Sequence, residues 1–315
     1  MTETCRSVLL LGATGTIGRA TAKALIAAGH KVVAPVRAKS DLPFAEICDM
    51  TQPAFEVLMA DYATDAVISC IASRSGTPQD ARAIDRDLNR AALRAAVNVG
   101  VEQFILLSAI CVQKPKLAFQ HAKLAFEADL QAAPINWSIV RPTAYFKSLS
   151  GQVNRLRAGK PFLLFGDGEL TACKPISDAD LGRYLTLCLG EPEMQNRILP
   201  IGGPGPAITP RAQGEMLFTA LGLPPRYKHV PVALMSGIIA VLSGLGAVLP
   251  RLREKAELAR IGRYYATESM LVWDETHGRY DAEATPEFGT ETLADHYKRL
   301  VTEDMADERG AHAVF

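Results

Sequence analysis

A glycine triplet with the spacing GxxGxxG occupies positions 12, 15 and 18, after the apolar run Ser7–Leu11 and before a helical pattern of apolar residues. Glycines in this setting let the backbone turn tightly and approach a pyrophosphate, while the following helix aims its N-terminal N–H groups at the phosphates. The pattern therefore predicts a dinucleotide-binding loop. The expected cofactor contacts in this loop are Gly12, Thr14, Gly15, Thr16, Ile17 and Gly18.

The choice between NADH and NADPH is expected at the end of the second strand, residues 31–36. An acidic residue there accepts the ribose hydroxyls of NAD, whereas a cation pairs with the 2′-phosphate of NADP. No acid lies between Gly18 and Asp41, and Arg37 follows the strand directly, so the sequence favours NADPH. The alternative for Arg37 is a solvated loop cation. Asp49 is expected to contact the adenine, or else to belong to a surface turn.

The catalytic candidates follow the strand 104–108. In the short-chain reductase pattern a serine ends a central strand, and a YxxxK pair lies on the next helix. This chain offers Ser108, expected at the cofactor, and Lys123, but Phe119 stands at the tyrosine position. A carbonyl reduction needs an acid at the developing alkoxide, which phenylalanine cannot supply. We predict that Lys123 is catalytic, as a ribose anchor or as a general acid or base; an exposed helix lysine is the other interpretation.

Two polar side chains follow the strand that ends in Arg141-Pro142. Tyr145 and Lys147 are expected at the mouth of a substrate site, although packing and solvation explain them equally well. His121 lies two residues before Lys123 and therefore points roughly to the opposite side of the helix. It is a weaker candidate than the lysine.

The elements that position these residues alternate along the first half of the chain. Short apolar strands are predicted at 66–71, 104–108 and 137–140, and helices at 80–99 and 119–132. Alternation of this kind predicts an α/β fold, a Rossmann-type doubly wound parallel sheet with a smaller C-terminal substrate-side region. We expect an NADP-binding core over residues 1–142. Residues 143–315 are expected to form the substrate-binding region, partly interleaved with the core.

Several segments of the chain resemble one family. They are LLLGATGTIGRATAKALIAAGHKVVAPVR, DAVISCIASRSGTPQDARAIDRDLNRAAL, LLSAICVQKPKLAFQHAKLAFEADL with its FxxxK, and ESMLVWDETHGRYDAEATPEFGTETLADHY. Together they resemble the NADPH-dependent 3,8-divinyl (proto)chlorophyllide 8-vinyl reductases, an atypical branch of the short-chain reductases related to the NmrA and isoflavone reductase groups. The resemblance covers most of the chain.

This resemblance implies reduction of the 8-vinyl group of a divinyl tetrapyrrole to ethyl, with NADPH as hydride source. It gives cofactor roles to the three glycines and Arg37, gives the lysine position to Lys123, and places Ser73 and Arg74 near the cofactor groove, unless they cap a turn. Hydride addition to a conjugated C=C bond puts charge into the macrocycle, so a dedicated acid is needed less; Lys123 or water would protonate the adjacent carbon. A non-catalytic NADP-sensing regulator of the NmrA type and an isoflavone-reductase-like enzyme remain alternatives.

The composition limits partners and location. The 315 residues carry 34 basic and 34 acidic side chains, and this lack of a basic excess argues against nucleic acid. The six cysteines are spread singly, so no metal site is predicted and a reducing compartment is expected. Because the first motif begins by Val8, we expect no cleavable leader and a cytoplasmic protein. The oligomeric state is left open.

A mean hydropathy of +0.08 is high for a soluble enzyme. Much of it comes from residues 230–250, which carry no charge and are followed by a basic cluster that begins at Arg251. A membrane span is disfavoured by the glycines inside this segment and the prolines near its ends. A buried or pocket-lining helix for the flat pigment, and an interfacial helix giving peripheral membrane contact through 230–263, are the remaining interpretations.

Overall fold

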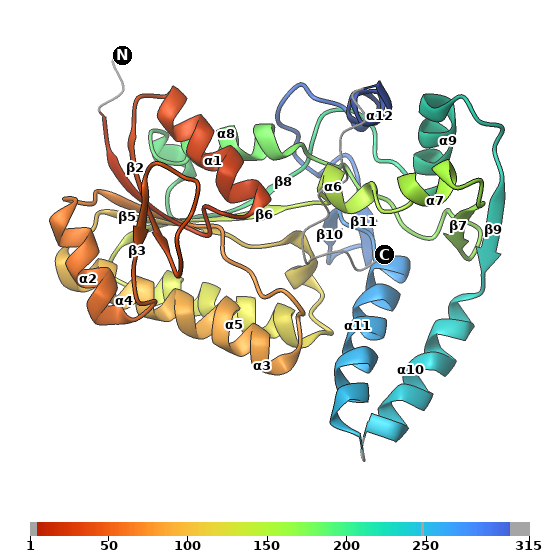
Figure 1. Cartoon of the computed structure of the whole chain (residues 1–315), viewed down its shortest axis with the longest axis horizontal. Helices are drawn as coiled ribbons and strands as arrows, with labels where there is room; N and C mark the ends of the chain where they lie inside the picture. Colours follow the sequence, from red (N-terminus) through yellow and green to blue (C-terminus); the bar gives the residue numbers. More distant parts are fainter. Residues whose placement is uncertain (1–4, 247–248, 303–315) are drawn as a thin grey trace.

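Seven parallel strands form the central sheet in the order β3-β2-β1-β4-β5-β6-β8 (Figure 1). The computed structural model describes residues 5–246 and 249–302. The order reverses between β1 and β4, where Rossmann-type folds place a nucleotide, and the predicted doubly wound sheet is confirmed. The strands are β1 (Ser7–Leu11), β2 (Lys31–Val36), β3 (Ala45–Ile47), β4 (Ala66–Ser69), β5 (Gln103–Leu107), β6 (Asn136–Pro142) and β8 (Arg197–Ile201).

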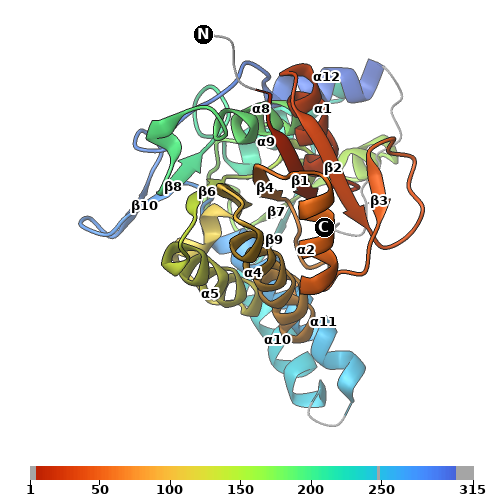
Figure 2. The same ribbon diagram turned by 90° about the vertical axis from the view of Figure 1, so that its left-hand side faces the viewer.

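Helices cover both faces of this sheet, as Figures 1 and 2 show. Alternation along β1 sends Val8 and Leu10 into one apolar core, and Leu9 and Leu11 into the other. All four side chains are buried. The first core includes residues of α1 (Thr16–Ala27) and α8 (Asp178–Leu187), and the second includes residues of α2 (Gln52–Asp61), α4 (Asn89–Val99) and α5 (Ala118–Ala132).

The helix predicted over 80–99 is divided into three parts. It consists of α3 (Pro78–Ala81), a seven-residue π-helix (Arg82–Leu88) and α4. The buried Asn89 side chain supports the π-helical segment, because its Nδ2 donates to the Asp85 carbonyl oxygen at 3.0 Å and its Oδ1 accepts from Ser69 Oγ at 2.6 Å. These two bonds tie the segment to the end of β4. π-helical turns are rare in proteins, but those that occur are often found at functional sites.

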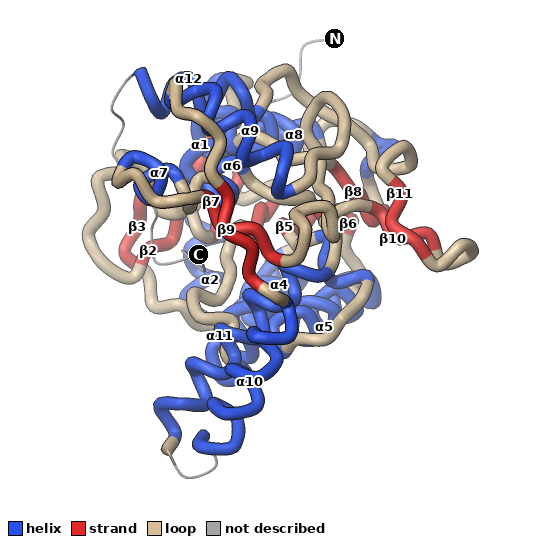
Figure 3. Tube along the Cα trace, turned by 90° about the vertical axis from the view of Figure 1, so that its right-hand side faces the viewer, coloured by secondary structure: helices blue, strands red, loops and turns tan. Residues whose placement is uncertain are grey.

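The region after residue 142 returns to the sheet and also builds a smaller lobe (Figure 3). Its α8 and β8 belong to the sheet layers, whereas residues of the smaller lobe share a separate apolar core. The expected region also contains 247–248 and 303–315, which lie outside the described residues. The other elements of this region are α6 (Phe146–Leu149), α7 (Val153–Arg157), β7 (Phe162–Phe165), α9 (Pro210–Leu221), β9 (Tyr227–Val230), β10 (Val272–Asp274), β11 (Arg279–Asp281) and α12 (Leu293–Thr302). A 3₁₀ turn, Pro192–Met194, precedes β8, and another, Ile110–Gln113, follows β5 in the core.

Two further helices, α10 (Val232–Gly246) and α11 (Pro250–Thr267), pack on each other and project from the body as a hairpin in all three views (Figures 1, 2 and 3). Large apolar side chains of α10 are exposed, including Leu234 at 55% and Val241 at 61%. The expectation of a buried helix is therefore wrong for most of α10. Among the described helices, none combines the length and hydropathy needed to cross a membrane.

Candidate cofactor and substrate site

The glycine loop is shaped to receive a phosphate. Gly12 has φ +78°, and a Cβ atom there would lie 2.9 Å from the Cys70 carbonyl carbon. A Cβ atom at Gly18 would overlap the Gly12 carbonyl oxygen. Gly15 N–H donates to that same oxygen at 3.0 Å, and α1 begins without a side-chain cap. The first-turn N–H groups of α1 therefore remain available to an anion, so the residues present fit a dinucleotide pyrophosphate.

Lys147 lies on the phosphate side of the site. Its Nζ donates to Thr16 Oγ1 at 2.8 Å, which joins α6 to the glycine loop. Asp178, in the first turn of α8, lies close enough to interact with the Lys147 charge. Burial raises the pKa of Asp178 to about 6, and Lys147 opposes this rise only in part. The structure thus places Lys147 beside the predicted cofactor loop, and the substrate contact expected for it stays a prediction.

Tyr145 lies over the carboxyl ends of β4 and β5. Burial raises the pKa of its phenol, and Cys70, Cys111 and Asp178 lie close enough to add to the effect. Because Cys70 follows β4 and Cys111 belongs to the turn after β5, the phenol faces the edge of the sheet where ligands bind in this fold. This location is compatible with the predicted substrate contact.

Arg37 is an exposed cation at the end of β2. It forms no hydrogen bond or ion pair with the described residues. The neighbouring Arg19 was not predicted, although it directly follows the last glycine of the loop. Its guanidinium donates to both carboxylate oxygens of Asp41, at 3.0 and 2.8 Å, and to the Thr14 carbonyl oxygen. Asp41 already pairs with Arg19, whereas Arg37 is exposed, as is Lys39 two residues further on. The contact of Arg37 with a 2′-phosphate stays a prediction.

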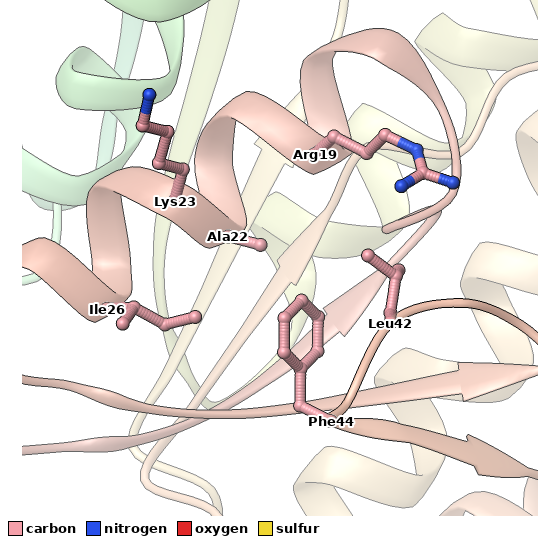
Figure 4. Close-up of a pocket in the computed structure, with 6 residues that line it drawn as sticks. All are labelled: Arg19, Ala22, Lys23, Ile26, Leu42 and Phe44. Atoms are coloured by element: carbon pink, nitrogen blue, oxygen red, sulfur yellow. The ribbon is translucent and has the colours of Figure 1, made fainter.

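A pocket opens beside Arg19, between α1 and the loop before β3 (Figure 4). The hydrogen bonds from Arg19 hold the pKa of Asp41 at about 2. Asp49 lies beyond the end of β3 and is exposed, so a ligand could reach it, and its adenine contact stays a prediction. The pocket is lined by Arg19, Ala22, Lys23, Ile26, Leu42 and Phe44.

Lys123 forms a buried ion pair that sequence reasoning missed. Its Nζ lies 2.9 Å from Asp85 Oδ1, and the two side chains are 11% and 0% exposed. Ser73 N–H also points at Oδ1, at 3.4 Å, so the carboxylate connects α5 with the loop after β4. Asp85 Oδ2 is buried and has no partner among the described residues. Arg74 is exposed on the same loop. The signal in the sequence was Asp85 itself, an acidic residue on the apolar face of the helix predicted over 80–99.

Ser108 has a different environment from the one expected. Its side chain is buried, and Oγ donates to Glu127 Oε1 on α5 at 2.5 Å. Arg141 of β6 pairs with the same carboxylate. The Ser108 hydroxyl thus has a partner inside the protein, and the cofactor contact expected for it stays a prediction. In the described part of the chain, no group of three or more His, Cys, Asp or Glu side chains is arranged to hold a metal ion.

The sequence relatives identify the family. Residues 12–192, more than half of the chain, match the NAD(P)H-binding family. The chloroplastic divinyl chlorophyllide a 8-vinyl-reductase of Zea mays is 44% identical, and the match covers 98% of this chain and 83% of the maize protein. The chain belongs to the divinyl chlorophyllide a 8-vinyl-reductase family. The glycine loop and Lys123 of this reductase-family chain both lie within the matched residues 12–192.

Solved structures of other reductases have the same fold as this 8-vinyl-reductase family member. An NADPH-dependent quinone oxidoreductase from Escherichia coli, complexed with NADPH, superposes with a TM-score of 0.69 at 18% identity, over 93% of this chain and 99% of that one. Leucoanthocyanidin reductase from Vitis vinifera gives a TM-score of 0.68 at 14% identity, over 94% and 99%. At these identities the likeness establishes the Rossmann-like fold.

Proposed function

We propose that this chain reduces the 8-vinyl group of divinyl (proto)chlorophyllide to ethyl with NADPH, in (bacterio)chlorophyll biosynthesis. The observation that carries the proposal is the 44% identity to a curated 8-vinyl-reductase across nearly the whole chain. Residues 1–142 would hold the cofactor, and 143–315 would form the substrate side, with α8 and β8 shared between them. The glycine cradle and the buried lysine pair agree with this division.

The cofactor-binding residues follow from the geometry. The glycine loop and the N-terminus of α1 would hold the pyrophosphate, with Lys147 beside them, and Arg37 would pair with the 2′-phosphate. Ser73 and Arg74 would contact the cofactor from the loop after β4, and Asp49 would contact the adenine. When bound, NADPH supplies a hydride.

Lys123 contributes a fixed positive charge at the groove. The Asp85 carboxylate, which lies on the π-helix and is completely buried, holds the Lys123 ammonium group on its protein side. A charge held in this way stabilises negative charge that develops in a conjugated macrocycle, and it orients a ribose hydroxyl. Reduction of a conjugated C=C bond places no charge on an alkoxide oxygen, which agrees with phenylalanine at position 119.

The test is a mixture of purified protein, divinyl chlorophyllide and NADPH, followed by chromatography of the pigment. We expect conversion to the 8-ethyl product, and Lys123→Ala should lose most turnover even at saturating NADPH. His121→Ala, exposed on the same helix, is the matched control and should keep its turnover. Unchanged divinyl pigment with intact NADPH binding would favour the NADP-sensing regulator and would overturn the reductase proposal.

We also propose that the α10–α11 hairpin docks on an anionic lipid surface. Helix α10 has no charged residue, and an apolar stripe along it is exposed between 46% and 61%. Helix α11 carries five basic and two acidic residues in a chain of zero net charge. An apolar face beside a basic one is the pattern of an interfacial helix. The exposed stripe on α10 consists of Leu234, Ile238, Val241 and Leu245, and Leu249 at the start of α11 is exposed as well.

Flotation with vesicles separates this docking from other uses of the stripe. The protein should float with vesicles that contain phosphatidylglycerol and much less with pure phosphatidylcholine. Replacing Ile238 and Val241 by serine should abolish flotation. Leu170→Ser is the control, because Leu170 is also 50% exposed but lies outside the hairpin. Self-association that depends on Ile238 and Val241, without flotation, would show that a second copy covers the stripe and would overturn the proposal.

A further inference from the structure

Ile261 of α11 shares an apolar cluster with Phe119 of the FxxxK helix, at the place where the short-chain reductase pattern has its tyrosine. Phe119 and Ile261 converge there on Gly76. A Cβ atom built at Gly76 would lie 2.9 Å from Ile261 Cδ1 and 3.5 Å from Phe119 Cδ1. Residues four apart lie on the same face of a helix. Tyr265 therefore follows Ile261 by one turn on the face of α11 that meets α5, just as Lys123 follows Phe119 by one turn on α5.

The Tyr265 hydroxyl lies within the same electrostatic cluster as Lys123. It lies close enough to the Cys111 thiol, in the turn that follows β5, for the two groups to interact. The Lys123 charge also acts on Cys111, so both groups lie around this one thiol. Tyr145 approaches the cluster from the end of β6. Two phenols and one ammonium group thus surround the carboxyl end of β5.

Tyr265 differs from its neighbour Tyr264 in how firmly its hydroxyl is held. The Tyr264 hydroxyl donates to the carbonyl oxygens of Cys111 and Lys114, at 2.9 and 3.1 Å, and the side chain is buried. The partner of the Tyr265 hydroxyl is a sulfur, which is a weak acceptor. Its side chain is 36% exposed. Tyr264 is therefore held by two carbonyl acceptors, whereas Tyr265 is more exposed and has the weaker thiol contact.

The Tyr265 phenol also keeps its proton. Burial of the hydroxyl raises the pKa of Tyr265 well above its ordinary value, and Cys111 raises it further. Part of the side-chain surface is accessible, while the hydroxyl lies on its buried side. A phenol in this state is a proton donor and not a nucleophile.

We propose that Tyr265 is the proton donor of the 8-vinyl reduction, in place of the tyrosine missing at position 119. The proposal rests on the reductase function proposed above. Hydride from NADPH forms a C–H bond at the vinyl terminus, and the π pair moves to the adjacent carbon and into the macrocycle. The Tyr265 O–H bond breaks as a C–H bond forms at that carbon, and solvent reprotonates the phenolate beside Lys123. One hydride and one proton are consumed for each ethyl group formed.

The decisive comparison is Tyr265→Phe against Tyr264→Phe. Loss of a general acid lowers turnover by about 10²–10⁴-fold. We expect a fall in this range for Tyr265→Phe, with unchanged dissociation constants for NADPH and for the pigment, measured separately by fluorescence quenching. Tyr264→Phe should lower the melting temperature and keep its turnover. Wild-type protein that fails to reduce the pigment would contradict the proposed function, whereas active wild type with equally active Tyr265→Phe would contradict only this assignment.

A second variant keeps the assignment testable if Tyr265→Phe misfolds. Tyr265→His places a titratable donor near Lys123, Cys111, Tyr145 and Tyr264. Partial turnover should return near pH 6 and disappear near pH 8, because only protonated histidine donates. If Tyr265 has a purely structural role, the turnover of Tyr265→His will not rise as pH falls from 8 to 6. Turnover that Tyr145→Phe abolishes while both Tyr265 variants retain it would assign the donor to Tyr145 and overturn the proposal.

Discussion

The ion pair between Lys123 and Asp85 makes a quantitative prediction for the variant Lys123→Met. Methionine keeps an apolar stem and leaves the fully buried Asp85 carboxylate without its partner. Removing one member of a buried pair costs about 3–5 kcal/mol. A carboxyl escapes this cost by taking a proton, which for an ordinary aspartate costs about 4 kcal/mol at pH 7. We expect the free energy of unfolding at pH 7 to fall by about 3–4 kcal/mol.

Urea denaturation of the cofactor-free protein, followed by circular dichroism, measures this loss. The loss should shrink by about 1.4 kcal/mol for each unit of pH below 7, because the stranded carboxyl takes its proton more easily. Adding Asp85→Leu to the variant should restore most of the stability. The matched control is Arg90→Met, which breaks the Arg90–Asp129 pair, whose side chains are 32% and 35% exposed. It should cost less than about 1 kcal/mol.

A small loss that does not change with pH would refute this reasoning. If Lys123→Met and Arg90→Met cost the same, the Asp85 carboxylate is solvated in solution. The role given to Asp85, holding the lysine at the groove, would then fail with it.

Three further predictions concern single charges. Arg37→Ala should weaken NADPH binding by about 10- to 100-fold in fluorescence titrations and leave NADH binding unchanged, because one charged hydrogen bond to the 2′-phosphate is lost. Burial alone would raise the pKa of Glu268, but hydrogen bonds from Lys116, Tyr280 and Lys114 lower it to about 2. The wild-type protein should therefore be more stable than Glu268→Gln by up to about 3 kcal/mol. This difference should be complete above pH 4.5 and disappear as pH falls toward 2. Burial raises the pKa of Asp178 from 3.8 to about 6, so its ionisation destabilises the fold as pH rises between these values. The free energy of unfolding of Asp178→Asn at pH 7, measured by urea denaturation, should therefore exceed that of the wild type by up to about 3 kcal/mol.

The sheet and the glycine loop were predictable because their signals are local. The continuous apolar run over residues 7–11 and the spacing of the three glycines depend on a few neighbouring residues. Arg37 and Lys123 were found for the same reason, since one follows a strand and the other belongs to a helix motif. Ser108 was placed correctly at the end of its strand, but its hydroxyl partner depends on Glu127, which lies on a different element.

The missed features depend on contacts between distant segments. Tyr265 lies close to Cys111 only because α11 returns to the turn after β5, and no spacing in the sequence records that approach. Asp85 faces Lys123 through a π-helix, which α-helical periodicity does not predict. Hydropathy of α10 gave its helix but not its exposure, because burial depends on a partner element and α10 packs on α11 alone among its principal contacts.

The π-helical segment has a genetic consequence. Its hydrogen bonds skip one residue more than those of an α-helix, so Arg82–Leu88 accommodates an additional residue between fixed flanks. We expect deletion of one codon within it to restore α-helical pairing and to leave the buried face of α4 against the sheet, while the carboxylate of Asp85 rotates away from Lys123. Fold and ion pair are thus separable by a single deletion. Descendants that lost this residue would inherit the sheet and the glycine loop without the charge that holds the lysine.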